Sequence, residues 1–370
     1  MLIYLLLLFG GTIYFFLDEK YLNSKKFLSV FFIWFPILFF YFIFPATQYN
    51  VGTDYFTYRN YYAQPDLIEL YRIKGELVFY YIYRFIVENQ LGEQSIFYFC
   101  TFFNTCLLFF TMFKLRKANF NIAIIFFLFL TITGIYHNQM NGLRAYMGVM
   151  CIPLAFVYLA ENKLIKTAVL IILAISSHFS SVVSLLLLPM KILIPLSNRK
   201  LAFLFFLLPF IYVSLMQLVP SFVNLFFFRY SHYLNSDYAT GISLINLFSK
   251  LYYLPLFVFF WFVYLKRKPI SIYCESSVFR KYFDFSIVVW VVTYWFIILS
   301  LEYGFFFRLQ SAFIFFYIFP IYYLYQYLID SKSWRRVSFL SVYILAPYVL
   351  KVTYMASGEY NYSNYLFYSF

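Results

Sequence analysis

Long apolar stretches recur along this 370-residue chain, and they restrict its fold more than any other feature. Hydrophobic residues make up 64% of the sequence and charged residues only 12%, too few to cover the surface of a soluble domain. A helix needs about 20 apolar residues to cross a bilayer, and lipid leaves no water to satisfy an open backbone. We therefore predict an all-α polytopic membrane protein with about twelve transmembrane helices. The predicted spans are 2–17, 27–44, 95–113, 121–136, 143–160, 164–177, 179–194, 201–218, 251–265, 283–301, 309–328 and 337–355.

Lysine and arginine collect in every second gap between these stretches. Nineteen of the 28 basic residues lie in one set of gaps, although the other set contains the longest loops. By the positive-inside rule the basic gaps are cytoplasmic, so both chain ends and the remaining gaps are expected to face outward. The net charge of +13 is then a topology signal, and it gives no reason to expect nucleic acid as a partner. The basic gaps contain Lys20, Lys25, Lys26, Lys114, Arg116, Lys117, Lys163, Lys166, Lys191, Arg199, Lys200, Lys266, Arg267, Lys268, Arg280, Lys281, Lys332, Arg335 and Arg336.

No internal repeat, linker or break in composition divides the chain, so we expect one integral membrane domain over 1–370 with outer loops at 45–94 and 219–250. Segment 77–87 is apolar but too short to span and contains Arg84, so we interpret it as an interfacial or re-entrant helix on the outer face. The N-terminal stretch has no basic leader or small-residue cleavage site, which favours a retained helix. The four cysteines show no paired spacing, which indicates neither a disulfide framework nor a zinc site.

The first outer loop opens with the sequence Gly52-Thr53-Asp54-Tyr55. Glycine and aspartate at a helix exit are ordinary turn residues, so a turn and a functional carboxylate are both open interpretations for Asp54. The later charges of this loop are more typical of a solvated surface. They include Asp66, Glu69 and Arg72, and Glu76 follows them in the same loop.

Two short outer gaps place polar residues at the membrane. Arg144 begins an apolar run, and a cation costs roughly 2.5–3.5 kcal/mol at the bilayer centre and less near its edge. His178 lies among serines in the stretch 164–196, which is too short for two full spans, so its turn should be recessed below the outer surface. For Arg144 a functional role competes with an ion pair or snorkelling, and for His178 with a hydrogen bond to a neighbouring helix.

Two further outer gaps contain charged residues and histidine. Glu302 and Arg308 bracket an aromatic run, where they either pair with each other or serve a function. The loop at 219–250 contains Arg229 and His232. All three histidines fall in outer gaps, but no two have the i, i+4 spacing of metal ligands, so we predict no metal site.

An outward site of arginines, a histidine and carboxylates suits an anionic group carried at the membrane surface. Guanidinium groups bind phosphate oxygens through paired hydrogen bonds and need no metal. Arginines would stabilise the pyrophosphate that leaves a lipid-linked sugar, while a histidine or carboxylate takes the proton of the attacking hydroxyl. A flippase for the same lipid-linked sugar and a glycan ligase remain alternatives, although a flippase should carry charges along a path through the bilayer.

Four short motifs occur in an order that resembles EpsG-like and Wzy-like bacterial polymerases of O-antigen, capsule or exopolysaccharide. The likeness runs from about Tyr49 to the tail. Members usually have Arg-Gln where this chain has Arg144-Ala145. The motifs are Gly52-Thr53-Asp54-Tyr55, Asn141-Gly142-Leu143-Arg144-Ala145, Ser177-His178-Phe179-Ser180 and Phe307-Arg308-Leu309.

This resemblance implies an architecture like that of the type C membrane glycosyltransferases. It further implies a metal-independent polymerase without cofactors, in the bacterial cytoplasmic membrane, with its active site facing the periplasm or the cell exterior. Such an enzyme transfers the growing glycan from undecaprenyl pyrophosphate to the sugar of another lipid-linked repeat unit. By the same resemblance, Arg144 and Arg308 would bind pyrophosphate, and either His178 or Asp54 would be the base.

Further substrate contacts are expected from polar and aromatic residues of the outer gaps. The expected partners are the undecaprenyl-pyrophosphate-linked oligosaccharide, membrane lipid and a chain-length regulator. The candidate substrate-binding residues are Tyr55, Arg59, Arg84, Arg229 and Glu302.

Overall fold

The computed structural model describes residues 2–226, 244–266, 270–303, 305–355 and 358–365. Within these ranges the protein is helical and contains no strand, only one isolated β-bridge. Eight helices are long and apolar enough to cross a membrane, or ten if each of two bent helix pairs is one span. The predicted segments 164–177 and 179–194 form shorter apolar helices, Leu164–Ser177 and Phe179–Ile192. The prediction of an all-α polytopic membrane protein is confirmed.

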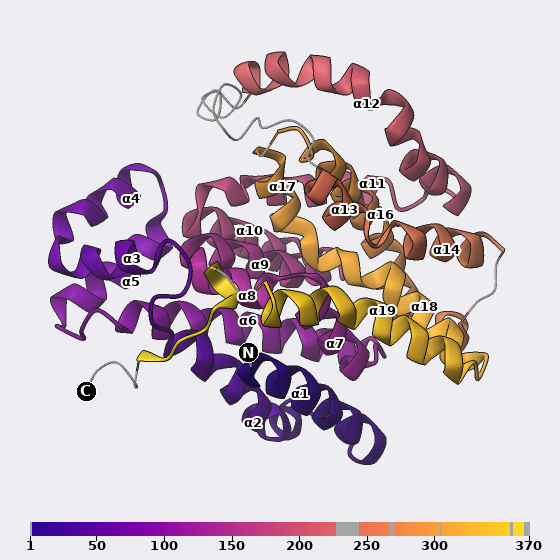
Figure 1. Ribbon diagram of the computed structural model, residues 1–370, viewed down its shortest axis with the longest axis horizontal. Coiled ribbons are helices and arrows are strands. Elements are labelled where there is room, and N and C mark those ends of the chain that lie inside the picture. The colour runs from indigo at the N-terminus through magenta and orange to yellow at the C-terminus, as the bar shows by residue number, and fades with distance from the viewer. Residues whose placement is uncertain (1, 227–243, 267–269, 304, 356–357, 366–370) are drawn as a thin grey trace. The chain divides into compact units, whose positions relative to one another are not determined.

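The chain divides into two compact units, of which the first comprises Met1–Leu185 and Lys332–Phe370. In Figure 1 the helices of this unit run from indigo to magenta, with α19 in yellow. Its elements are α1 (Leu2–Tyr21), α2 (Phe27–Ala46), α3 (Tyr55–Ala63), η1 (Pro65–Ile68), α4 (Glu69–Ile73), α5 (Leu77–Glu88), α6 (Ser95–Lys117), α7 (Ile122–Ile132), α8 (Ile135–Asn141), α9 (Leu143–Ala160), α10 (Leu164–Ser177), η2 (Phe179–Leu186), α19 (Trp334–Thr353) and η5 (Gly358–Tyr360).

The second unit comprises Leu186–Ser331. Its core is α16, which packs against α12, α17, η4 and α18. The expectation of one membrane domain over the whole chain stays a prediction. The elements of this unit are α11 (Leu187–Ile192), α12 (Asn198–Phe226), α13 (Leu244–Leu251), α14 (Leu254–Leu265), α15 (Ser271–Glu275), α16 (Ser277–Leu299), α17 (Phe305–Phe313), η4 (Ile314–Tyr317) and α18 (Ile318–Asp330).

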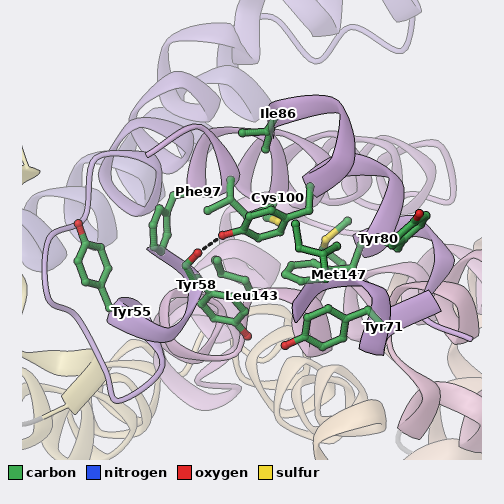
Figure 2. Packing of buried hydrophobic residues seen from close by; sticks show 13 residues of the cluster. Tyr55, Tyr58, Tyr71, Tyr80, Ile86, Phe97, Cys100, Leu143 and Met147 are labelled. Carbon is green, nitrogen blue, oxygen red and sulfur yellow. Dashed lines mark hydrogen bonds between the residues drawn. The ribbon is translucent and has the colours of Figure 1, made fainter. Parts of the chain in front are cut away.

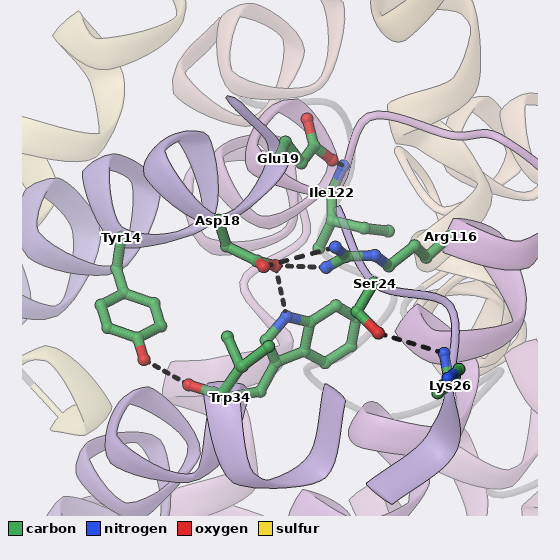
Figure 3. Close-up of polar contacts among 9 residues, drawn as sticks. Tyr14, Asp18, Glu19, Ser24, Lys26, Trp34, Arg116 and Ile122 are labelled. Atoms are coloured by element: carbon green, nitrogen blue, oxygen red, sulfur yellow. Dashed lines mark hydrogen bonds and ion pairs between the residues drawn. The ribbon is translucent and has the colours of Figure 1, made fainter. Parts of the chain in front are cut away.

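Two neighbouring carboxylates at the end of α1, one of them in a buried ion pair, connect four helices of the first unit (Figure 3). Asp18 at the end of α1 pairs with Arg116 of α6, and both side chains are almost fully buried. Trp34 of α2 donates its indole N–H to the same carboxylate at 2.8 Å, and its ring lies 5.4 Å from the guanidinium. Glu19 accepts a hydrogen bond from the backbone of Ile122, where α7 begins. Because a buried charge is costly unless it is paired, these contacts fix the helix ends relative to one another.

A glycine allows α9 and α10 to pack closely. A Cβ atom at Gly148 would lie 3.0 Å from the backbone oxygen of Ala174 and would collide with the side chain of Ser181. Arg144 lies one helical turn before Gly148 on α9, and His178 follows Ala174 by one turn at the end of α10. The close approach therefore brings together the two helix ends that carry these residues.

Much of segment 45–94, the predicted first outer loop, is folded into a helical lobe, made of α3, η1, α4 and α5 (Figure 1). The hydroxyl of Tyr83 donates to the backbone oxygen of Tyr58 inside this lobe. The helix predicted at 77–87 is α5, which has 12 residues and is not among the candidate spans. Figure 2 shows the buried cluster in which the aromatic lobe packs against α6 and α9, which consists of Tyr55, Tyr58, Ile68, Tyr71, Phe79, Tyr80, Tyr83, Ile86, Ile96, Phe97, Cys100, Leu143 and Met147.

The C-terminal segment returns to the beginning of the outer loop. Gln48 and Asn364 form an antiparallel β-bridge. The backbone N–H of Tyr49 donates to the carbonyl of Ser363 at 2.9 Å, and residue 365 donates to residue 47 at 2.7 Å. The last part of the chain therefore holds the segment that precedes Asp54.

We predict that Arg116→Met destabilises the protein by about 3–5 kcal/mol, because it leaves Asp18 buried without its cation. The measurement is thermal unfolding of the purified protein in detergent. Lys163→Met is the matched control, since Lys163 pairs with Glu161 while about half exposed and should cost less than about 1 kcal/mol. Equal melting temperatures for the two variants would contradict the prediction.

Candidate functional site

The carboxylate of Glu76 connects two residues that the sequence analysis selected. Its Oε2 accepts a hydrogen bond from Nη1 of Arg144 at 2.6 Å, and its Oε1 lies 2.6 Å from Nδ1 of His178. The backbone N–H of Phe179 also donates to Oε1, at 3.3 Å. The side chain of Glu76 is 3% exposed, that of Arg144 25% and that of His178 15%. Glu76, Arg144 and His178 thus form a largely buried cluster, which we call the carboxylate cluster.

A Schellman turn at the end of α4 directs Glu76 into the protein. Gly75 has φ +80°, and its N–H donates to the carbonyl of Arg72 at 3.0 Å. The N–H of Glu76 donates to the carbonyl of Tyr71 at 2.8 Å, which completes the motif. Glycine suits the left-handed position because it has no Cβ. The carbonyl of Glu76 then accepts from Tyr80 in the first turn of α5. The residue therefore sits at a rigid junction between two helices.

His178 ends α10, as the sequence predicted for this turn. Its backbone is extended, with φ −155° and ψ 126°, and its N–H still donates to the carbonyl of Ala174 at 3.0 Å. Ser177 donates its hydroxyl to the carbonyl of Leu173, within its own helix. The partner of Nδ1 is the Glu76 carboxylate.

The electrostatics of the carboxylate cluster fix its protonation. Burial alone would raise the pKa of Glu76, but the hydrogen bond and charge of His178 and the charge of Arg144 lower this pKa from 4.5 to about 2. Glu76 is therefore ionised at physiological pH. An ionised carboxylate only accepts hydrogen bonds, so Nδ1 of His178 must be the donor. In the neutral imidazole this leaves Nε2 as the nitrogen that accepts a proton.

Arg144 lies against the aromatic lobe. Its guanidinium is 4.6 Å from the centre of the Tyr71 ring, a cation–π geometry, and Tyr71 donates its hydroxyl to that of Tyr61 at 2.6 Å. The pKa of the Tyr58 hydroxyl is raised by burial, lowered in part by the charge of Arg144 and raised by that of Asp54. Asp54 and Arg144 therefore both lie close enough to Tyr58 to act on its hydroxyl.

Asn141 joins two of the sequence motifs. Its Oδ1 accepts hydrogen bonds from the backbone N–H groups of Thr53 and Asp54, at 2.8 and 3.0 Å, and from the Thr53 hydroxyl at 3.3 Å. The Asp54 carboxylate lies 3.2 Å from the same Thr53 hydroxyl, whose single proton can go to either acceptor. Asn141 precedes Arg144 by three residues, so the Gly52-Thr53-Asp54 loop is held at the same helix end as the arginine.

Three candidate substrate-binding residues of the lobe have partners within the protein. Arg59 forms an ion pair with Glu93 and lies 5.7 Å from the centre of the Tyr55 ring. Tyr55 itself is completely buried, which favours a role in packing. Arg84 pairs with Glu88, and both side chains are more than half exposed. Their contact with substrate stays a prediction.

The remaining candidates lie in the second unit. Arg308 is an exposed residue of α17, and Glu302 accepts a hydrogen bond from the hydroxyl of Tyr212 at 3.2 Å. Arg229 and His232 lie outside the described residues.

His137 belongs to the packing of the first unit. It is fully buried, stacks on Tyr360 with ring centres 4.4 Å apart and has its Nε2 3.3 Å from the hydroxyl of Tyr348. In the part of the chain that the structure describes, no group of three or more His, Cys, Asp or Glu residues is arranged to hold a metal ion.

These observations define a polytopic helical membrane protein whose carboxylate cluster joins an arginine at a helix start to a histidine at a helix end. The EpsG family model matches residues 30–368. The chain therefore belongs to the EpsG family, a family of polysaccharide polymerase-like membrane proteins, and the resemblance noted in the sequence is confirmed. Comparisons with curated proteins and with solved structures give no match.

Sequence reasoning missed the central residue of the cluster. Glu76 appeared to be one of several surface charges in the outer loop, whereas it is almost fully buried. Two signals could have indicated this. Gly75 marks a helix end, and the apolar run of α5 begins directly after Glu76, so the carboxylate had to lie at a junction between packed helices.

We predict that ionised Glu76 stabilises the protein above pH 4.5. A folded-state pKa of about 2 means that this stabilisation is complete above the ordinary pKa of 4.5 and is lost as pH falls toward 2. The expected loss is on the order of 3 kcal/mol. Thermal unfolding of wild type and Glu76→Gln between pH 6 and pH 3 should show the wild type losing its advantage on acidification. A constant difference would contradict the low pKa.

We also predict that Asn141→Ala loosens the Thr53–Asp54 loop, because the backbone N–H groups of Thr53 and Asp54 lose their acceptor, at a cost of roughly 1–3 kcal/mol. Asn141→Asp keeps an acceptor oxygen and should retain most of that stability. Limited proteolysis within residues 50–56 measures the effect. Equal cleavage rates for Asn141→Ala and wild type would show that Asn141 does not hold the loop.

Proposed function

We propose that the protein polymerises lipid-linked oligosaccharide repeat units on the outer face of the bacterial cytoplasmic membrane. In this reaction the growing glycan leaves undecaprenyl pyrophosphate and is joined to a sugar hydroxyl of another lipid-linked unit. Membership of the EpsG family suggests a polysaccharide polymerase-like role. The observation that carries the proposal is the bridge that Glu76 makes between Arg144 and His178, because it couples a phosphate-binding cation to a proton acceptor.

His178 acts as the general base in this proposal. The carboxylate of Glu76 holds Nδ1 as a donor, so Nε2 takes the proton of the attacking sugar hydroxyl. The imidazolium that forms lies beside an ionised carboxylate, which stabilises the new charge. The hydroxyl oxygen then bonds to the anomeric carbon of the donor glycan as the bond from that carbon to the pyrophosphate oxygen breaks.

Arg144 stabilises the leaving pyrophosphate. Its guanidinium is fixed on one side by Glu76 and on one face by Tyr71, while a quarter of its side chain stays exposed. A cation that is already oriented loses little entropy when it binds an anion, so it acts on the charge that develops in the transition state. Arg308 of the second unit is a further proposed pyrophosphate ligand.

Asp54 orients the acceptor sugar or serves as the base in place of His178. Asn141 fixes its backbone, and its charge acts on the same tyrosine hydroxyl as that of Arg144. The two roles differ in one testable way. A base cannot be replaced by an amide, whereas an amide still accepts one hydrogen bond from a sugar. Polymerisation retained in Asp54→Asn and lost in His178→Asn would assign the base to His178.

Deletion of the gene distinguishes this function from its alternatives. A surface glycan reduced to one repeat per carrier supports a polymerase. Lipid-linked units trapped inside the cell would indicate a flippase, and long polymer left on its lipid would indicate a ligase. Gel analysis of the glycan together with extraction of the lipid-linked units makes this measurement.

We predict that Glu76→Gln, Arg144→Ala, Arg308→Ala and His178→Ala each abolish long polymer when expressed in the deletion strain. Loss of a general base or its orienting carboxylate should slow the reaction roughly 100-fold or more. Glu69→Gln and Arg72→Ala are matched controls, because this ion pair lies on the same lobe but is about half exposed. Immunoblots of the membrane fraction check that each variant is present. Full-length polymer from the cluster variants would refute the assignment.

A further inference from the structure

One side of α5 exposes large apolar side chains. Leu77, Tyr81 and Phe85 follow one another at four-residue intervals and are between 40% and 60% exposed. The spacing places them on one stripe of the helix, which we call the α5 stripe. The opposite side is buried in the lobe through Phe79, Tyr80, Tyr83 and Ile86.

The α5 stripe is continuous with the exposed side of a membrane-spanning helix. The ring of Phe85 meets that of Phe99 edge to face, with centres 5.8 Å apart. Phe99 lies one turn inside α6, a candidate span, and Phe102 on the same helix is exposed as well. Exposed apolar side chains on a spanning helix contact lipid, so the α5 stripe extends a lipid-facing surface.

The edge of the α5 stripe is charged. Arg84 follows Tyr81 and Glu88 follows Phe85 by about one turn, and the two charged residues pair with each other in an exposed position. An apolar stripe beside a charged edge is typical of a helix that lies in the plane of a bilayer interface, and tyrosine is favoured at this depth. Three side chains also cover far less than the roughly 1,000 Å² that a stable protein interface needs, which disfavours a second copy as the occupant.

We propose that the α5 stripe binds the lipid surface and that α5 lies in the headgroup region of the leaflet where α6 begins. Glu76 immediately precedes α5, so lipid contact fixes the depth of the carboxylate cluster. In terms of the proposed function, on which this consequence rests, the cluster is held at the depth where the pyrophosphate of a lipid-linked donor lies. Tyr81 and Phe85 are then positioning residues for a reaction that they do not touch.

Spin-label accessibility tests the contact with lipid. The full chain carries Cys106→Ser and Cys274→Ser, which remove the two thiols that are not buried. Labels are attached singly at Tyr81→Cys and Phe85→Cys, and at Asp66→Cys as an exposed control on the same lobe. The protein is reconstituted in bilayer discs of phosphatidylcholine and phosphatidylglycerol. Collision rates with molecular oxygen, which enters lipid, and with the water-soluble nickel chelate NiEDDA are compared.

We expect the ratio of oxygen to NiEDDA collisions to be several-fold higher at residues 81 and 85 than at residue 66. Similar ratios at all three positions would place the α5 stripe in water and overturn the proposal. Low collision rates with both reagents would mean that protein covers the stripe, which overturns it as well. Leu77→Cys supplies a third stripe position if one variant does not fold. The measurement uses no glycan, so its outcome is independent of whether the chain polymerises sugars.

Discussion

A carboxylate withdrawn from water is the constraint on which the rest of the site depends. Glu76 is almost fully buried, and a buried charge is tolerated only when its partners replace the water it has lost. Arg144 and the backbone of Phe179 donate to it, and His178 completes the set. Because the partners come from α9 and from the end of α10, satisfying one carboxylate fixes the relative position of two helices and a turn.

The packing of the aromatic lobe explains how segment 45–94, which connects two apolar helices, can hold Glu76 in a fixed position. Its tyrosines pack with their rings buried and bond through their hydroxyls, as in the pairs Tyr71–Tyr61 and Tyr83–Tyr58. Tyrosine combines a large apolar surface with a polar end that must find a partner, so each ring is fixed in direction as well as position. Tyr71 also offers its face to Arg144, which ties the lobe to the membrane-spanning part of the first unit.

The spans of the protein could be predicted because their signal is local. Twelve apolar segments are visible in the sequence, and the short segments around His178 are helical as expected. Arg144 and His178 could also be selected, since a charge at a helix start and a histidine between two short apolar runs are costly unless they have a partner. Their common partner was not predictable. Glu76 lies 68 residues before Arg144 and 102 before His178. The spacing of apolar residues within one helix carries no information about contacts between residues so far apart in the sequence.

The β-bridge between Gln48 and Asn364 has a consequence for how the protein is made. The hydrogen bond between Ser363 and Tyr49 joins residues 314 positions apart, and the described helices from α3 to η5 are synthesised between them. Residues 363–365 must therefore be synthesised, after all the residues of α19, before the segment that precedes Asp54 acquires these backbone partners. Contacts that close so long a loop form late, so the segment before Asp54 is held in place only after the helices between residues 49 and 363 have been synthesised.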